Sequence, residues 1–133
     1  MELEQYIFRI KKGSDRPTYE TVTTLKKEER SACFFQREFI LAFLELKYNL
    51  SNIIPCQIAF KDIQNLIKRI DKVILKPSLI KRTLPGSIPE NQSYKSFPFL
   101  NWILDDLEIV KSMLERILKE WNEEYNYYYI FFS

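Results

Sequence analysis

The sequence contains no histidine. This absence excludes the catalytic triads and dyads that use imidazole as their base, and it removes a ligand that most zinc sites use. The two cysteines, Cys33 and Cys56, are too few and too far apart in the sequence to form a thiolate zinc site. The two glycines stand singly, so no glycine-rich loop for nucleotide phosphates is present. We therefore expect a protein that is not an enzyme, with no catalytic residue, no metal and no cofactor.

The sequence also lacks a long apolar run. The longest apolar stretches, residues 39–44 and 127–132, are far shorter than the eighteen or so residues of a membrane-spanning helix. The acidic start, Met1-Glu2-Leu3-Glu4, does not have the order of a secretory signal. We expect an intracellular, cytoplasmic protein with no membrane insertion. Its two thiols should be free and buried, although an intermolecular disulfide remains an alternative.

Alanine and glycine are scarce, whereas isoleucine, lysine, asparagine, tyrosine and phenylalanine are abundant. This bias is typical of AT-rich coding sequence and suits a virus, a mobile element or an AT-rich microbe. A chain of 133 residues with 46% apolar content fits a single domain, residues 1–133, with one core.

Hydrophobic periodicity predicts a mainly α fold. Aromatic and β-branched residues at 6–10 and 18–25, with turn residues between them, predict a β-hairpin over residues 1–25. Residues 26–75 are predicted to form two helices. The first, to residue 50, is apolar around most of its circumference and should lie centrally, and the second, over 56–75, is amphipathic.

Prolines interrupt the helical pattern in residues 77–98, which we predict to be a long loop that is either a binding element or disordered. Residues 99–125 are the clearest helix, because their apolar positions alternate steps of three and four over three heptads. The aromatic tail, residues 126–133, should add a strand to the hairpin or dock in a partner's groove. The predicted architecture is a three- or four-helix bundle with a small antiparallel sheet.

Charge is distributed unevenly along the chain. The net charge of +2 hides a segment, residues 61–82, with seven basic side chains against two acids, and a second, residues 99–125, with three basic side chains against seven acids. On a helix, the lysines of the first segment fall within about a quarter turn of one another and could lie along a phosphate backbone. The predicted nucleic-acid-binding residues are Lys61, Lys68, Arg69, Lys72, Lys76, Lys81 and Arg82.

Two classes of binding function follow. The first is a small accessory protein that contacts the nucleic-acid backbone, DNA or RNA, through the basic helix face. The alternative is a protein-binding or self-assembling subunit, in which the same lysines solvate their helix, pair with the acids of residues 99–125, or meet an acidic protein or anionic lipid. The predicted protein interface comprises Trp121, Tyr125, Tyr127, Tyr128, Tyr129 and Phe131.

A third pattern could hold a cation. Asn101, Asp105 and Glu108 share one face of the predicted helix over 99–125 and offer oxygen ligands for Mg²⁺. Acid-rich faces opposite an apolar seam are common on solvated helices, so we assign no metal site.

Overall fold

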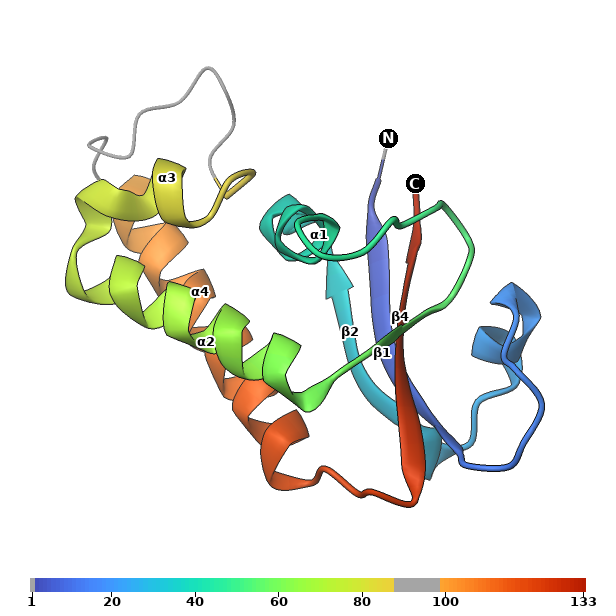
Figure 1. Ribbon diagram of the computed structural model, residues 1–133. Coiled ribbons are helices and arrows are strands. Elements are labelled where there is room, and N and C mark those ends of the chain that lie inside the picture. The colour runs from blue at the N-terminus through green and yellow to red at the C-terminus, as the bar shows by residue number, and fades with distance from the viewer. Residues whose placement is uncertain (1, 88–98) are drawn as a thin grey trace.

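The computed structural model describes residues 2–87 and 99–133, and its centre is a four-stranded antiparallel sheet in the order β2-β1-β4-β3 (Figure 1). Helices account for about 50% of the structure and strands for 21%. The prediction of a mainly α helical bundle is therefore wrong. The strands are β1 (Glu4–Lys11), β2 (Arg30–Phe35), β3 (Cys56–Ile58) and β4 (Tyr125–Phe132).

The aromatic tail forms β4, which lies inside the sheet between β1 and β3. Its pairing with β1 runs from Phe132 opposite Glu4 to Tyr125 opposite Lys11, so the two chain ends lie side by side (Figure 1). Tyr127 and Tyr129 face one layer of the core, and Tyr128 and Ile130 face the other. Burial on both faces explains why this strand reads as an almost continuous apolar run instead of an alternating one.

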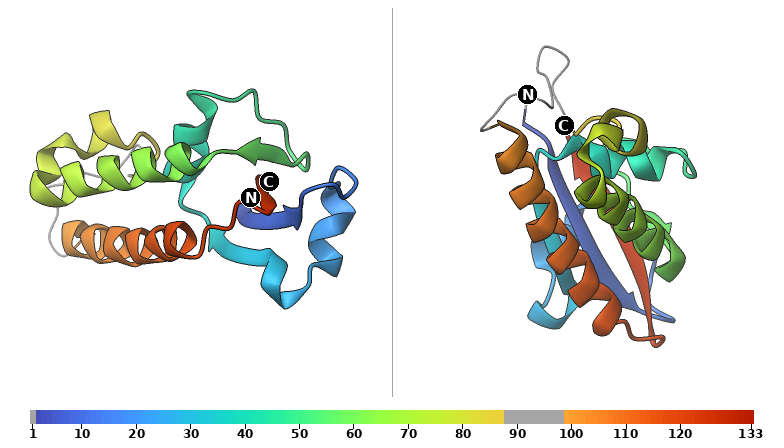
Figure 2. Two further views of the ribbon diagram at one scale, coloured as in Figure 1. Left: turned by 60° about the horizontal axis from the view of Figure 1, so that its bottom comes forward. Right: turned by 90° about the vertical axis from the view of Figure 1, so that its left-hand side faces the viewer.

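Two long helices, α2 (Phe60–Leu75) and α4 (Phe99–Lys119), run side by side over one face of the sheet (Figure 2). The helix α1 (Glu38–Glu45) packs into the same layer, and the segment between β1 and β2 covers part of the opposite face. The remaining elements are short: the 3-10 helices η1 (Tyr19–Thr24), η2 (Lys27–Glu29) and η3 (Pro77–Leu79), and the single-turn helix α3 (Ile80–Thr83).

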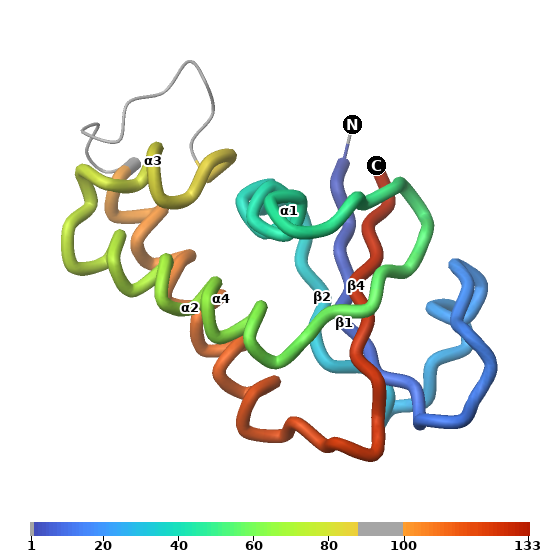
Figure 3. The backbone as a smooth tube through the Cα atoms, viewed as in Figure 1, coloured from blue at the N-terminus to red at the C-terminus, as the bar shows by residue number. Residues whose placement is uncertain are grey.

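The predicted central helix over residues 26–50 is replaced by β2 and the much shorter α1. The chain turns between them through Gln36 and Arg37, which both have positive φ. A short apolar run is compatible with either a strand or a helix. Here the segment becomes the strand β2 because it pairs with β1. After α1 the chain follows a long loop to β3, as the tube in Figure 3 shows, so the second predicted helix begins at Phe60 and not at Cys56.

The predicted hairpin over residues 1–25 is wrong in its second half. Residues 19–24 form a 3-10 helix because threonine side chains bond to the local backbone: the Thr23 hydroxyl donates to the Glu20 carbonyl at 2.7 Å, and Thr21 Oγ1 accepts the Thr18 N–H at 2.9 Å. The next strand in the chain, which pairs with β1, is β2 at Arg30–Phe35.

Two further boundaries differ from the prediction. The helix expected over 99–125 ends at Lys119, because Tyr125 already belongs to β4. The expected loop over 77–98 begins with η3 and α3, and its residues 88–98 lie outside the described residues. Cys33 and Cys56 are free, as predicted, but both are half-buried, and burial raises the pKa of each thiol.

One polar side chain, Gln5, is fully buried in the core. Its amide nitrogen donates to the carbonyls of Gln36 at 2.5 Å and Arg37 at 3.2 Å, and its amide oxygen accepts the Tyr129 hydroxyl at 2.6 Å. Burial raises the pKa of Tyr129, which keeps this hydroxyl a donor. These hydrogen bonds attach the turn before α1 to the two central strands, β1 and β4. By fixing this turn, they help to position α1 beside α2.

Candidate nucleic-acid interface

The predicted basic residues lie on α2 and on α3, which follows it in the chain. Four of them, Lys61, Lys68, Lys72 and Lys76, occupy the solvent side of α2 and its C-cap, and we call these four the basic stripe. All four side chains are exposed. At 1.5 Å per residue the stripe is about 22 Å long. Lys81 and Arg82 of α3 are also exposed, whereas Arg69 is half-buried.

The ammonium groups of the basic stripe have no carboxylate partner within residues 2–87 and 99–133. The salt bridges found there join Arg37 to Asp106, Lys47 to Asp62, Lys111 to Asp71 and Arg116 to Glu120. The acids of α4 therefore do not neutralise the stripe, and its positive charge faces solvent.

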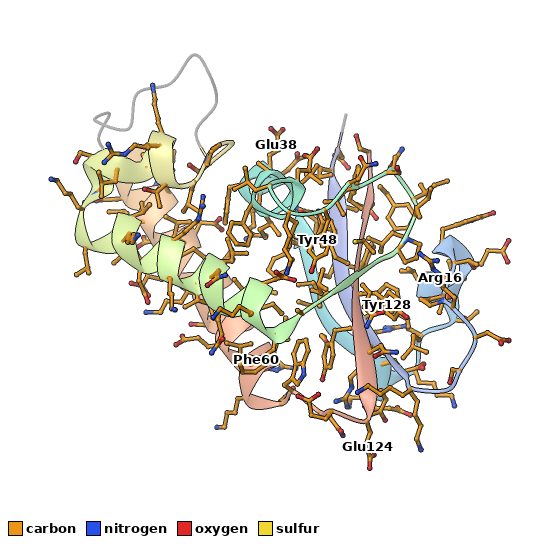
Figure 4. All side chains as sticks on the ribbon, viewed as in Figure 1. Arg16, Glu38, Tyr48, Phe60, Glu124 and Tyr128 are labelled. Carbon is orange, nitrogen blue, oxygen red and sulfur yellow. The ribbon has the colours of Figure 1, made fainter. Side chains whose placement is uncertain are left out.

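The two acids of α2 are both engaged away from the stripe. The Asp71 carboxylate forms a salt bridge with the Lys111 ammonium of α4, with 2.7 Å between oxygen and nitrogen. Asp71 therefore lies on the side of α2 that faces α4. Asp62 is 4% exposed and points toward the end of α1. There its carboxylate accepts hydrogen bonds from the Lys47 ammonium at 2.9 Å and from the Tyr48 hydroxyl at 2.5 Å. Figure 4 shows Tyr48 between α1 and α2. The surface of α2 between these two acids is purely cationic or neutral.

Asp62 also fixes where α2 begins. Its carboxylate accepts the backbone N–H of Ala59 at 2.7 Å, which satisfies one of the free amides at the start of the helix. Burial alone raises the pKa of Asp62, but the hydrogen bonds from Tyr48, Ala59 and Lys47 outweigh burial and hold the pKa below its ordinary value of 3.8. The charged carboxylate thus ties α1 to the first turn of α2.

Substitution of Asp62→Asn is expected to lower the free energy of unfolding at neutral pH by about 2–3 kcal/mol, because a charged acceptor of three hydrogen bonds is lost. A depressed pKa in the folded state stabilises the fold above pH 3.8, and this stabilisation disappears as the pH falls through the folded-state pKa. The difference between wild type and variant should therefore be present at neutral pH and disappear at an acidic pH below the folded-state pKa.

Urea unfolding at the two pH values measures this difference. The matched control is Asp71→Asn, which breaks a surface salt bridge and should cost under about 1 kcal/mol at either pH. An equal loss for the two variants at neutral pH would show that Asp62 is no more than a surface charge.

A cavity of about 330 Å³ opens beside the basic stripe, between the end of α1 and the middle of α2. One wall is apolar and consists of Phe43, Leu44 and Leu46; the other carries Asn65 and the cations Lys68, Arg69 and Lys72, and Lys47 and Asp62 complete the lining. The Arg69 guanidinium lies 5.2 Å from the centre of the Phe43 ring and donates to the Thr83 carbonyl at 3.2 Å. These two contacts hold Arg69 over the cavity and explain why it is half-buried.

Three of the six residues predicted as a protein interface lie inside the fold. Tyr127, Tyr128 and Tyr129 are buried. Trp121 stacks on Tyr127 with ring centres 3.6 Å apart and meets Phe60 edge-on. These rings join the end of α4 to the sheet and to the start of α2, so the buried tyrosines offer no surface for a partner in the folded chain. Tyr125 and Phe131 are half-buried.

Asn101, Asp105 and Glu108 are all exposed on α4. Among the described residues no group of three or more His, Cys, Asp or Glu side chains is placed to hold a metal ion. In the same ranges, no helix combines the length and apolar character that crossing a membrane requires.

Sequence reasoning located the basic stripe through helical spacing but missed the cavity beside it. Phe43 belongs to α1, and Leu46 and Lys47 follow its last residue; all three were predicted to lie inside a longer central helix. The only local signal is that Leu46 and Lys47 come soon after the apolar run at residues 39–44, with Glu45 between them and the run. No protein-family model, curated protein or solved structure matches this chain.

Proposed function

We propose that this protein binds the phosphate backbone of nucleic acid through the basic stripe and Arg69, with Lys81 and Arg82 assisting. One observation carries the proposal: the four stripe lysines are exposed and have no carboxylate partner within the described residues. Both acids of α2 are bonded to groups outside the stripe. A helix face of this kind attracts a polyanion. Each phosphate that contacts a lysine releases counterions, and this release favours binding.

The length of the stripe sets the size of the contact. Phosphates of one strand are spaced about 3.4 Å apart along a stacked helix, so a stripe of about 22 Å spans about six of them. Lysine contacts the phosphate as a point charge and does not read bases. The affinity should therefore depend strongly on salt and little on sequence.

Titration of a labelled oligonucleotide with the protein, followed by fluorescence anisotropy at about 0.05 M and 0.2 M salt, tests the proposal. With four to six single-strand contacts, the affinity should fall about 50- to 300-fold between the two concentrations. Binding that is absent at the lower salt concentration would overturn the proposal.

Protein binding is the second candidate function, and one observation favours it. Trp102 is 67% exposed and Ile109 is 55% exposed, and the two lie two helical turns apart on the same side of α4. Large apolar side chains grouped on a surface are typical of contact sites. A solution mass above that of the monomer, reduced by Trp102→Asp, would favour this candidate; unchanged oligonucleotide binding in that variant would separate the two functions.

A further inference from the structure

The cavity beside the basic stripe has two unlike walls. Leu46, at its rim, is 64% exposed, so the apolar wall is open to solvent. Facing it across the cavity, Asn65 and Lys68 of α2 present an amide and an ammonium group. A ligand that fills this space must offer a flat apolar surface on one side and polar edges and a negative charge on the other.

A simple anion does not satisfy this description, because a phosphate would contact Lys68, Arg69 and Lys72 but leave the apolar wall exposed to water. A nucleotide unit does satisfy it. Its base can pack against Phe43 and Leu46, its polar edge can bond to the Asn65 amide, which both donates and accepts, and its phosphate stays on the stripe.

The acids of α4 limit which nucleic acid can reach this position. Asp105, Glu108 and Glu115 are exposed on α4, which packs directly beside α2. Packed helices are about 8–10 Å apart, whereas the major groove of a duplex alone is about 12 Å wide, so a duplex laid along α2 would bring phosphates over these carboxylates. A single strand is narrow enough to follow α2 alone, and only its bases are free to leave the stack.

We infer that the cavity receives an unstacked base of a single-stranded nucleic acid whose phosphates lie along the basic stripe. This inference rests on the proposed function and adds the ligand class: single-stranded, with one base inserted beside α1. The base enters between the apolar end of α1 and the amide of Asn65, and Arg69 lines the same cavity.

Three probes of about twelve nucleotides test the inference: a labelled oligo-dT, an abasic strand with the same backbone, and a duplex. Wild-type protein should bind oligo-dT about tenfold more tightly than either of the others. The double variant Leu46→Ala/Asn65→Ala should bind oligo-dT no more tightly than the abasic strand, whereas the duplex, which the acids of α4 disfavour, should still bind more weakly than oligo-dT binds to wild-type protein. The matched control Leu75→Ala/Gln64→Ala likewise replaces one leucine and one side-chain amide by alanine, at exposed or half-buried positions of α2 outside the cavity, and should keep the preference.

The outcomes separate the two claims. If wild-type protein binds the abasic strand as tightly as oligo-dT, the base has no site, and the inference is overturned while backbone binding stands. If the control variant loses the preference as well, the cavity is not the site of the base. If none of the probes binds at low salt, both the inference and the proposed function are wrong.

Discussion

The double variant Lys68→Glu/Lys72→Glu should lower the affinity for a single-stranded oligonucleotide by about 100-fold at about 0.05 M salt. Each phosphate contact releases counterions worth about eightfold in affinity at this salt concentration, and two contacts are lost at once. The two glutamates would also repel the remaining phosphates. Because both side chains are exposed and have no salt bridge with a described residue, the variant should keep its fold, with stability within about 0.5 kcal/mol of wild type.

The matched control is Lys11→Glu/Lys12→Glu. These two lysines are exposed where β1 ends, on the sheet and not on α2, and their reversal changes the net charge by the same amount. The control should bind within about threefold of wild type, since only distant, screened charges change. Equal losses in the two variants would mean that net charge, and not the basic stripe, attracts the ligand.

Removal of residues 127–133 should abolish cooperative folding. The deletion takes away all but the first two residues of β4, the strand that joins β1 to β3, together with the buried side chains of Tyr127, Tyr129 and Ile130. Each of these contributes about 1.5–3 kcal/mol of burial, and the backbone partners on both neighbouring strands are left unpaired. The sum approaches the whole stability of a small domain, about 5–15 kcal/mol. Thermal unfolding followed by circular dichroism should show no transition.

A shorter deletion provides the comparison. Removal of Phe132 and Ser133 takes away only the half-exposed end of β4 and should leave a cooperative transition at a lower temperature. If the longer deletion still gave a cooperatively folded monomer, the tail would be a docking segment and not a central strand. If the longer deletion abolishes the fold, any loss of partner binding in that variant would reflect unfolding and not a direct role of these tyrosines.

The helices α2 and α4 could be predicted because their apolar side chains keep helical spacing over four or more turns, and such long patterns fit no strand. The tail could be predicted as a strand because six consecutive aromatic or β-branched residues fit a buried strand. By contrast, Ala32 to Phe35 fit a strand or a helix, and only their pairing with β1 makes them β2. That pairing depends on contacts distant in the sequence, which local patterns do not contain.

The same distinction applies to the candidate site. The basic stripe follows from spacing within one helix, so sequence alone predicted its members. The cavity requires the end of α1 to lie against α2, and this contact depends on the Asp62 hydrogen bonds and on the Gln5 network that fixes the turn before α1. Two residues that hold the site together, Asp62 and Gln5, are polar side chains whose burial no sequence pattern indicated.

The salt dependence of oligonucleotide binding, measured for wild type and for four single variants, is the most direct test of the claim that the basic stripe meets an external polyanion. The variants replace Lys61, Lys68, Lys72 or Lys76 by glutamine. A plot of log affinity against log salt should have a slope of about −3 to −4 for wild type, and each variant should reduce its steepness by about 0.7, the value of one single-strand phosphate contact. A wild-type slope near zero, or a slope that none of the four substitutions changes, would contradict the claim.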